Sequence, residues 1–545
     1  MSLKTLNFYN SGAIGAETDV NDPKKIISTY KYITPRLSGS LFRALFFLVT
    51  LLFGQYAKAE VKLPAIFSDG MVLQRNKPVL IWGFGSPGER ISVEIAGQVK
   101  TALTDTAGNW SIKLSPLKVG KPLQLMVKGR ENQIALQDIL VGEVFLCSGQ
   151  SNMAMSLDAC KRFGNPNAQT DAQQTTLPMV RIFQTPNSLF AAQPQKDVPG
   201  QWQSLSPERN LNYSAIAFYF SRSMYSYLKV PIGIIRSSNA GGPIEAKMPL
   251  GALLSVDCGK NYYDEVMKRS DPETMKKQAD EILKKWEKDV RDVTAVGQVP
   301  PKKPTVRNPL NGAYPAADWN GVIAPVIRYT KTAVLWYQGE HNVARAFDYR
   351  KLLPVLISAW RAESGNPDLP FIFIQLPAFA SITMNDNWAL IRESQLDVLK
   401  KTQHTGMVVT INTGDRKNIH PADKDIVADR IFKETQHLIY GEQVSGCGPL
   451  FDSFKVEGEK MILKFNHING SMKFLPGQAG KGFFIAGEDR KFYAATALIK
   501  GSSLEVSATD VPRPVAVRYA WAGFPEVSLV DAFDMPASPF RTDNW

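Results

Sequence analysis

The feature that most constrains the fold is a set of short apolar runs, bounded by polar loops, between residues 142 and 442. The clearest runs are 144–147, 332–336, 370–374 and 407–411. A strand that is apolar on both faces is typical of a parallel sheet buried on both sides. Helical stretches such as 214–228 and 388–401 lie between the runs. This alternation predicts an α/β domain over residues 142–442, with a mostly parallel sheet between two layers of helices.

Shorter alternating runs lie on both sides of this region. Before it, the runs 79–83, 91–95, 110–114 and 123–127 have the pattern of strands and are separated by turn sequences at 86–88 and 105–109. They predict an N-terminal β-sandwich over residues 60–141. After it, runs such as 461–465 and 515–519 predict a smaller C-terminal β module over residues 443–545.

A charged insertion near residues 259–305 interrupts the α/β region. Asp271, Pro272 and Glu273 combine an acidic cap with proline in the first helical turn. Apolar residues then recur every three or four positions from Met275 to Val293, which predicts an amphipathic helix with a solvated, lysine-rich face.

Residues 1–59 have the pattern of a leader with a signal peptide. Arg43 precedes an apolar core at 44–53, and Ala57-Lys58-Ala59 follows. A basic flank, a short apolar core and an Ala-x-Ala end predict cleavage before Glu60. The core is shorter than the roughly 20 residues that span a bilayer. We therefore expect export, to the periplasm or outside the cell, with no stable membrane span after cleavage.

Composition and charge exclude several classes of function. The formal net charge is +12, but no basic run is interleaved with aromatic residues, so we expect no nucleic-acid partner. The cysteines form no Cys-x-x-Cys pair and no cluster with histidine, so we expect no metal site. An even number of cysteines in an exported chain permits disulfides as well as free thiols. The cysteines are Cys147, Cys160, Cys258 and Cys447.

The sequence Gly149-Gln150-Ser151-Asn152-Met153 directly follows the buried run that ends at Cys147. A serine on a tight turn between a strand and a helix presents its Oγ above the sheet, beside a helix N-terminus. A plain helix cap uses the same residue types. A nucleophilic serine also needs a base. The five histidines of the chain are His341, His404, His420, His437 and His467.

Segments spread over nearly everything after Glu60 resemble the sialate O-acetylesterase family of the SGNH/GDSL hydrolase group. In order, these segments are 149–153, 231–238, 243–246, 336–342, 419–424 and 536–543. The resemblance implies an SGNH-like three-layer α/β/α domain, flanked by the two β modules.

The resemblance also implies a set of roles for individual residues. Ser151 becomes the nucleophile and His420 the general base that takes its proton. The negative charge of a tetrahedral intermediate needs an oxyanion hole, which is a set of hydrogen-bond donors already in place. By resemblance these are the N–H of Ser151, the N–H of Gly241, and the side-chain amide of Gln338, with Asn342 as its rival.

The residues just before His420 differ from the family pattern. The usual acid lies shortly before the histidine, but Lys417 and Asn418 occupy those positions here. Asp415 is the nearest acid upstream, so either Asp415 or a backbone carbonyl orients the imidazole, and the second case leaves a Ser–His dyad. We expect Glu340 to support the pocket through hydrogen bonds.

These roles imply hydrolysis of O-acetyl esters of sugars through an acetyl-enzyme, without a metal or an organic cofactor. The implied substrate is O-acetylated sialic acid, and acetylated xylan or another acetylated glycan is the alternative. Two further alternatives are a non-catalytic carbohydrate-binding protein and a glycosidase that uses Glu340 and Glu245 as its two carboxylates. The sequence leaves the oligomeric state open.

Overall fold

A large sheet with the strand order β13-β12-β11-β7-β10-β8-β9 forms the centre of the chain. The computed structural model describes residues 60–239, 241–295, 298–304, 310–381 and 383–545, so the expected signal peptide lies outside the described residues. The strands are β7 (Gln133–Gly149), β8 (Leu177–Gln184), β9 (Trp202–Leu205), β10 (Ile232–Ser238), β11 (Ala333–Tyr337), β12 (Phe371–Gln375) and β13 (Thr405–Val409).

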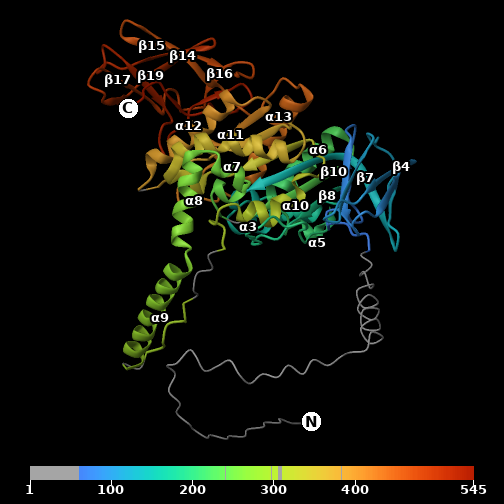
Figure 1. Ribbon diagram of the computed structural model, residues 1–545. Helices are drawn as coiled ribbons and strands as arrows, with labels where there is room; N and C mark the ends of the chain where they lie inside the picture. The colour runs from blue at the N-terminus through green and yellow to red at the C-terminus, as the bar shows by residue number, and fades with distance from the viewer. Residues whose placement is uncertain (1–59, 240, 296–297, 305–309, 382) are drawn as a thin grey trace, which may run out of the picture. The chain divides into compact units, whose positions relative to one another are not determined.

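Neighbouring strands from β13 to β8 are parallel, and β9 is antiparallel to β8. Figure 1 shows β7, β10 and β8 side by side. After β7 the chain builds one side of the sheet with β8 and β10, then crosses to build the other side with β11. In open α/β sheets, ligands bind beyond the carboxyl ends of the strands at such a switch point.

Helices cover both faces of this sheet. Phe145 of β7 packs edge-on against Phe220 of helix α6 (Ala215–Leu228), with ring centres 5.0 Å apart. Trp336 of β11 packs against Trp360 of helix α11 (Ala346–Glu363) at 5.4 Å. Trp336 is in register with Ser148, which is an odd number of positions from Phe145, so the two aromatic contacts lie on opposite faces. The predicted three-layer α/β/α arrangement is confirmed.

The remaining helices of the α/β region are mostly short. They are α2 (Ser151–Ala154), α3 (Leu157–Arg162), α4 (Ala168–Gln174), α5 (Pro207–Asn210), α10 (Ala324–Ile327), α12 (Asn385–Lys401) and α13 (Lys424–Tyr440), the 3₁₀ turns η1 (Ile244–Lys247), η3 (Glu340–Arg345) and η4 (Ile411–Thr413), and the π turn η2 (Trp319–Ile323).

The N-terminal strands lead directly into the central sheet. They are β1 (Val72–Gln74), β2 (Val79–Phe84), β3 (Arg90–Ile95), β4 (Gln98–Leu103), β5 (Asn109–Leu114) and β6 (Leu123–Lys128). The first part of β7 pairs with β6 in antiparallel fashion, and its last part pairs with β10 and β11. The boundary expected between residues 141 and 142 therefore falls inside one continuous strand of 17 residues.

The insertion is helical. It contains α8 (Asp257–Arg269) and α9 (Pro272–Ala295), and α7 (Leu250–Leu254) precedes it; all three are drawn in green in Figure 1. The Asp271 carboxylate accepts a hydrogen bond of 3.0 Å from the N–H of Thr274, so it caps α9 as the sequence predicts.

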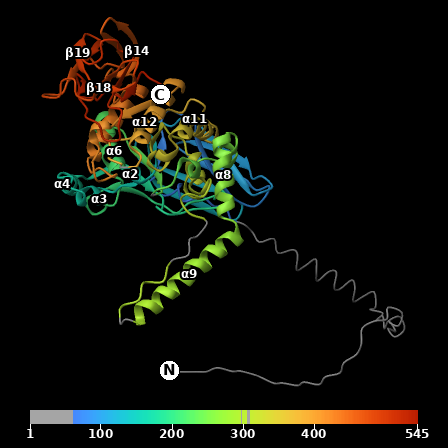
Figure 2. The same cartoon turned by 90° about the vertical axis from the view of Figure 1, so that its left-hand side faces the viewer.

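The C-terminal residues form antiparallel sheets around their own apolar core, and Figure 2 shows these strands grouped beside α12. Gln375 at the end of β12 donates a 2.8 Å hydrogen bond to Ser538, which connects this module to the central sheet. The strands are β14 (Leu450–Glu457), β15 (Lys460–Asn466), β16 (Met472–Phe474), β17 (Phe483–Ala486), β18 (Phe492–Ala494), β19 (Thr496–Lys500), β20 (Ser503–Ser507), β21 (Ala516–Tyr519), β22 (Leu529–Asp531) and β23 (Phe540–Arg541).

All four cysteines are free thiols, so of the two possibilities left open by the sequence the structure has the unpaired one. Burial raises the pKa of Cys147 and of Cys160 to about 12, which keeps both thiols protonated at neutral pH. Among the described residues, no helix has both the length and the apolar character needed to cross a membrane.

Candidate active site

Three strands end at the same level of the sheet. Gly149, near the end of β7, is in register with Ser238 of β10 on one side and with Tyr337 of β11 on the other. The loops that follow these strands therefore begin together. We call them the first loop (149–153), the second loop (239–245) and the third loop (338–345).

The turn that presents Ser151 depends on Gly149. This residue has φ +143°, and a Cβ at this position would lie 2.1 Å from the backbone oxygen of Tyr337. The N–H of Gln150 donates a 3.0 Å hydrogen bond to the same oxygen, which fixes the turn against β11. Only glycine allows this close approach of two backbones. Ser151 then begins α2, with its side chain half-buried.

Ser151 and His420 are in direct contact. His420 Nε2 lies 2.8 Å from Ser151 Oγ, although the two residues are 269 positions apart in sequence. Partial burial lowers the pKa of His420, and the positive charge of Lys424 lowers it further. The imidazole is therefore largely neutral at pH 7, which is the form that accepts a proton from a hydroxyl.

Asn152 and Lys424 hold the loop of His420 in place. The Asn152 side chain donates to Glu340 Oε1 and, at 3.1 Å, to the carbonyl of Ile419, which directly precedes His420. The buried ammonium of Lys424 donates to Asn152 Oδ1 at 2.8 Å and to the carbonyl of Pro421 at 2.7 Å. The residues on both sides of His420 are thus tied to the residue that follows Ser151.

Burial sets the protonation of this network. It lowers the pKa of Lys424 to about 8, and it raises the pKa of Glu340, partly offset by the hydrogen bond from Asn152. The second oxygen of Glu340, Oε2, is shielded from solvent and has no hydrogen-bond partner among the described residues. Glu340 therefore contacts Asn152, one of the two residues that hold the His420 loop in place.

The structure does not bring Asp415 to the imidazole. Its Oδ1 accepts hydrogen bonds from the N–H groups of Lys417 at 2.7 Å and Asn418 at 2.8 Å, and these bonds lower the pKa of Asp415. Asn418 in turn accepts a 2.9 Å bond from the N–H of His420. Among the described residues, no carboxylate hydrogen-bonds the ring of His420. Local turns of the backbone hold Asp415 away, which favours a Ser–His dyad.

The two backbone donors predicted for the oxyanion hole belong to Ser151 and Gly241. The N–H groups of Ser151 and Gly241 have no hydrogen-bond acceptor among the described residues. Gly241 has φ +75° and Gly242 has φ +81°, so this pair of glycines gives the second loop a backbone course that residues with a side chain rarely adopt.

The two amide candidates have other partners. Gln338 Nε2 donates to Asn342 Oδ1 at 2.8 Å and makes a long contact of 3.5 Å with the carbonyl of Gly242. Asn342 accepts a 2.9 Å bond from the N–H of Ile244 and donates a 2.9 Å bond to Glu245. Both side chains are fully buried. Their hydrogen bonds connect the second and third loops. Because a terminal amide has two N–H donors, these bonds leave the oxyanion role of both side chains a prediction.

Sequence reasoning missed the roles of Gln150, Asn152 and Lys424. Each stands inside a segment that carried the family resemblance, but only Ser151 and His420 were singled out there. A lysine at the first position of a helix that directly follows the His420 loop was the available signal, because side chains on a helix tilt toward its N-terminus. Gln150 makes long contacts of 3.5 Å with the N–H groups of Gly339 and His341.

Comparisons with known proteins agree on one family. The family model described as carbohydrate esterase, sialic acid-specific acetylesterase, matches residues 323–426, which include β11, the third loop and His420. The sialate O-acetylesterase of Mus musculus is 29% identical over 520 residues, covering 86% of this chain and 92% of that protein. The sialate O-acetylesterase of Homo sapiens is 28% identical over 440 residues, covering 73% and 75%.

A solved structure extends this similarity to the fold. The crystal structure of a carbohydrate acetylesterase from Xanthomonas citri is 31% identical to this chain, with a TM-score of 0.74. The match covers 89% of this chain and 100% of that one, so the similarity includes the β modules as well as the central sheet.

Proposed function

This chain belongs to the sialic acid-specific acetylesterase family of carbohydrate esterases, and we propose that it removes O-acetyl groups from sialic acids by means of a Ser151–His420 dyad. The observation that carries the proposal is the 2.8 Å contact between Ser151 Oγ and His420 Nε2 at the carboxyl edge of the sheet. Membership of the family makes the chain a carboxylic ester hydrolase.

In the first half of the reaction, Ser151 Oγ attacks the carbonyl carbon of the acetyl ester. His420 Nε2 takes the hydroxyl proton as the new C–O bond forms. The carbonyl oxygen becomes negatively charged, and the N–H groups of Ser151 and Gly241 donate to it. The ester bond to the sugar then breaks, His420 returns the proton to the sugar oxygen, and the acetyl group remains on Ser151.

In the second half, water hydrolyses the acetyl-enzyme. His420 Nε2 takes a proton from the water as its oxygen attacks the acetyl carbon, and the same backbone donors stabilise the second oxyanion. The bond to Ser151 Oγ breaks and acetate leaves, while His420 returns the proton to Ser151. Asn152, Asn418 and Lys424 hold the backbone at and on both sides of His420, and in this proposal that support replaces the usual carboxylate.

The contacts of Glu340 and Glu245 argue against a glycosidase. Glu245 is fully buried, where it pairs with Arg345 at 2.8 Å and accepts from Asn342. Glu340 accepts from Asn152. Both carboxylates therefore support loops rather than face a glycosidic bond. The names of the relatives favour sialic acid over acetylated xylan as the substrate.

We propose that the protein is exported. The proposal is supported by the basic, apolar and Ala-x-Ala pattern that ends at Ala59. N-terminal sequencing of the protein recovered from the medium or the periplasm would test it, with Glu60 expected as the first residue.

Acetate release from O-acetylated sialic acids and from acetylated xylan tests the activity. Ser151→Ala and His420→Gln should each lower kcat by at least about 10³-fold, as is usual for members of a nucleophile–base unit. Ser255→Ala, which changes an exposed serine, is the matched control. Equal rates for Ser151→Ala and the parent would refute the mechanism, and activity on xylan alone would leave the mechanism but change the substrate.

A further inference from the structure

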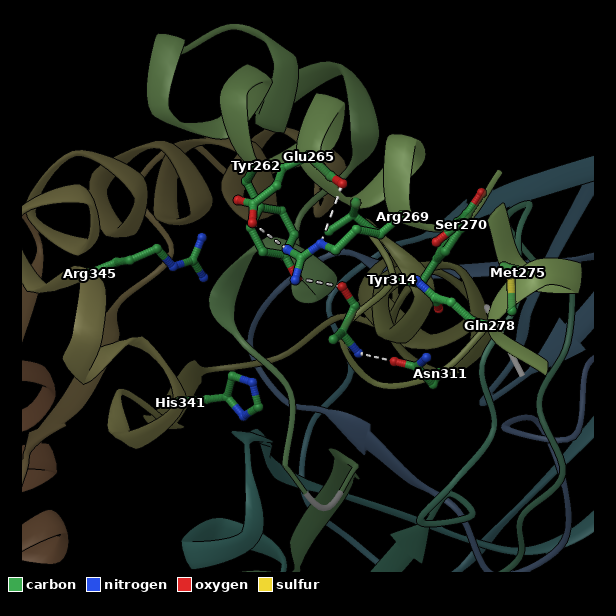
Figure 3. A pocket seen from close by; sticks show the side chains of 12 residues that line it. Tyr262, Glu265, Arg269, Ser270, Met275, Gln278, Asn311, Tyr314, His341 and Arg345 are labelled. Atoms are coloured by element: carbon green, nitrogen blue, oxygen red, sulfur yellow. Dashed lines mark hydrogen bonds and ion pairs between the residues drawn. The ribbon is translucent and has the colours of Figure 1, made fainter. Parts of the chain in front are cut away.

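A cavity of about 450 Å³ lies beside the third loop, and its walls come mainly from the insertion (Figure 3). Helix α8, the start of α9 and the turn at 311–314 form one side, and His341 and Arg345 of the third loop form the other. Its volume is within the range of roughly 300–1,000 Å³ that is usual for small-molecule sites. The catalytic mechanism uses none of the residues that line it.

The cavity walls contact two of the loops that build the active site. His341 contacts the side chain of Gln150 through its N–H, and Gln150 directly precedes Ser151. The carbonyl of Gly312 packs so closely on Gly242 that a Cβ there would lie 2.5 Å from it, and Gly242 directly follows the oxyanion donor Gly241. Residues in or next to the cavity wall therefore contact the loops that carry Ser151 and Gly241.

The aromatic side chains of the cavity are held rigidly. The hydroxyl of Tyr262 donates to the carbonyl of Ala313, and the Arg345 guanidinium lies 4.5 Å from the centre of the Tyr262 ring. The half-buried ring of Tyr314 lies on the turn at 311–314, with its hydroxyl 3.7 Å from Met267 Sδ of α8. Fixed, amphipathic rings of this kind provide apolar surface for the C–H faces of a sugar while leaving polar groups at the edge.

The charged side chains of the lining favour an acidic ligand. Arg269 and Arg345 are the cations and Glu265 is the only acid among the residues that line the cavity in the described part of the chain. Arg269 pairs with Glu265 through Nη2 at 2.6 Å, which leaves its other N–H donors for a ligand. Arg345 uses Nη1 for its ion pair with the buried Glu245 at 2.8 Å. A guanidinium has five N–H donors in a planar fork, so the rest of the Arg345 fork can bind a carboxylate.

We propose that this cavity binds the sugar ring of the acetylated substrate and that Arg345 and Arg269 select a sugar that carries a carboxylate. The inference rests on the proposed function, because it assigns the sugar that the Ser151–His420 dyad deacetylates to a specific place. It also gives the helical insertion a role, since α8 and α9 supply most of the wall.

The first test compares three substrates: an O-acetylated sialic acid, an acetylated neutral sugar and 4-nitrophenyl acetate, which lacks a sugar ring. Tyr314→Ala should lower the ratio of kcat/KM for acetylated sialic acid to that for 4-nitrophenyl acetate by at least about tenfold, mainly through KM, as is usual for a lost pocket contact. Tyr493→Ala, an exposed tyrosine of the C-terminal module, is the control. A ratio equal to that of the parent would overturn the proposal.

The second test addresses the charge. Arg269→Gln should lower kcat/KM for the acetylated sialic acid at least about threefold relative to the neutral sugar, because a charge-assisted contact is lost. Arg162→Gln is a matched control, because Arg162 is equally exposed and also pairs with an acid four residues earlier on a helix. An equal loss of kcat/KM for the acetylated sialic acid and for the acetylated neutral sugar would overturn the proposed selection for a carboxylate.

A binding measurement separates this proposal from the proposed function. In the Ser151→Ala background, calorimetry with sialic acid, the deacetylated product, reports on the cavity without any reaction. Adding Tyr314→Ala should weaken this binding at least about tenfold. Unchanged binding would refute the cavity as the sugar site, whereas full activity of Ser151→Ala would refute the dyad and leave the binding result standing.

Discussion

Replacing Lys424 with methionine tests how the reaction centre is held together. The buried Lys424 ammonium donates to Asn152 at 2.8 Å and to the carbonyl of Pro421 at 2.7 Å. Methionine fills a similar volume but donates no hydrogen bond, so two acceptors beside His420 lose their partner. Each buried acceptor left unpaired costs about 1–3 kcal/mol. The loop that carries His420 should therefore be held less firmly against Ser151.

The pH dependence of the free energy of unfolding shows in which direction, and by how much, Lys424 changes the stability. Burial lowers the pKa of Lys424 from the ordinary 10.5 to about 8, a shift worth roughly 3 kcal/mol. Between these two pH values the unfolded chain binds more protons than the folded one, so the Lys424 contribution to stability rises with pH. Lys424→Met has no such contribution. The gap in the free energy of unfolding between parent and variant should therefore widen by roughly 3 kcal/mol from pH 7.5 to 10.5.

Urea unfolding at several pH values measures this gap. Lys433→Met is the control, because Lys433 lies on the same helix α13 and pairs with Asp429 at the surface. A second readout is the pH profile of kcat/KM for 4-nitrophenyl acetate, whose acid limb should move to higher pH because one cause of the lowered His420 pKa is removed. A stability gap that is constant with pH, together with an unmoved acid limb, would refute the reasoning.

Further predictions concern the remaining residues of the site. Asp415→Asn should change kcat less than about threefold, because an amide oxygen can still accept the backbone N–H bonds of its turn; a loss as large as that of a nucleophile variant would place Asp415 on the imidazole. Gly149→Ala should destabilise the fold by at least about 1–3 kcal/mol and abolish ester hydrolysis, which thermal unfolding and acetate release would measure. Glu340→Gln should retain deacetylation, since a glutamine oxygen can also accept from Asn152; complete loss would mean that the carboxyl group itself takes part. In the parent enzyme, the acid limb of kcat/KM should have its midpoint below pH 6.5, since burial and Lys424 lower the pKa of His420.

The order of helices, sheet and helices was predictable because a strand that is buried on both faces has an uninterrupted apolar sequence. Runs such as 144–147 and 370–374 have no polar alternation, and this pattern belongs to parallel strands covered by helices on both faces. The three-layer domain and the helix starting near Asp271 followed from such patterns. The family resemblance added Ser151 and His420, which the structure places in contact at 2.8 Å.

Contacts between loops were less predictable, since each depends on a partner far away in the sequence. The Asn342 side-chain N–H donates to Glu245, 97 positions earlier, so the sequence position of Asn342 alone could not show this contact. Asp415 illustrates the opposite case. It was considered because it lies near His420, but a carboxylate in a turn bonds most readily to the N–H groups two and three residues ahead.

The length of β7 was also hidden, because its two halves have different sequence patterns. Residues 133–138 alternate between exposed and half-buried positions, whereas every position from 139 to 149 is buried. A change of pattern of this kind resembles the border between two domains, and here it occurs within one strand. The strand is half-exposed at its start and covered on both faces at its end.

The continuity of β7 limits how this enzyme can be rebuilt. A chain started at residue 142 would lack β6 and β1, which pair with β7 up to Gly142, and the strand would begin only seven residues before the turn at Gly149. The N-terminal module therefore cannot be exchanged as a unit, unlike a domain that is joined through a flexible linker. Engineers who wish to add a module to this hydrolase should leave the β7 ladder uncut.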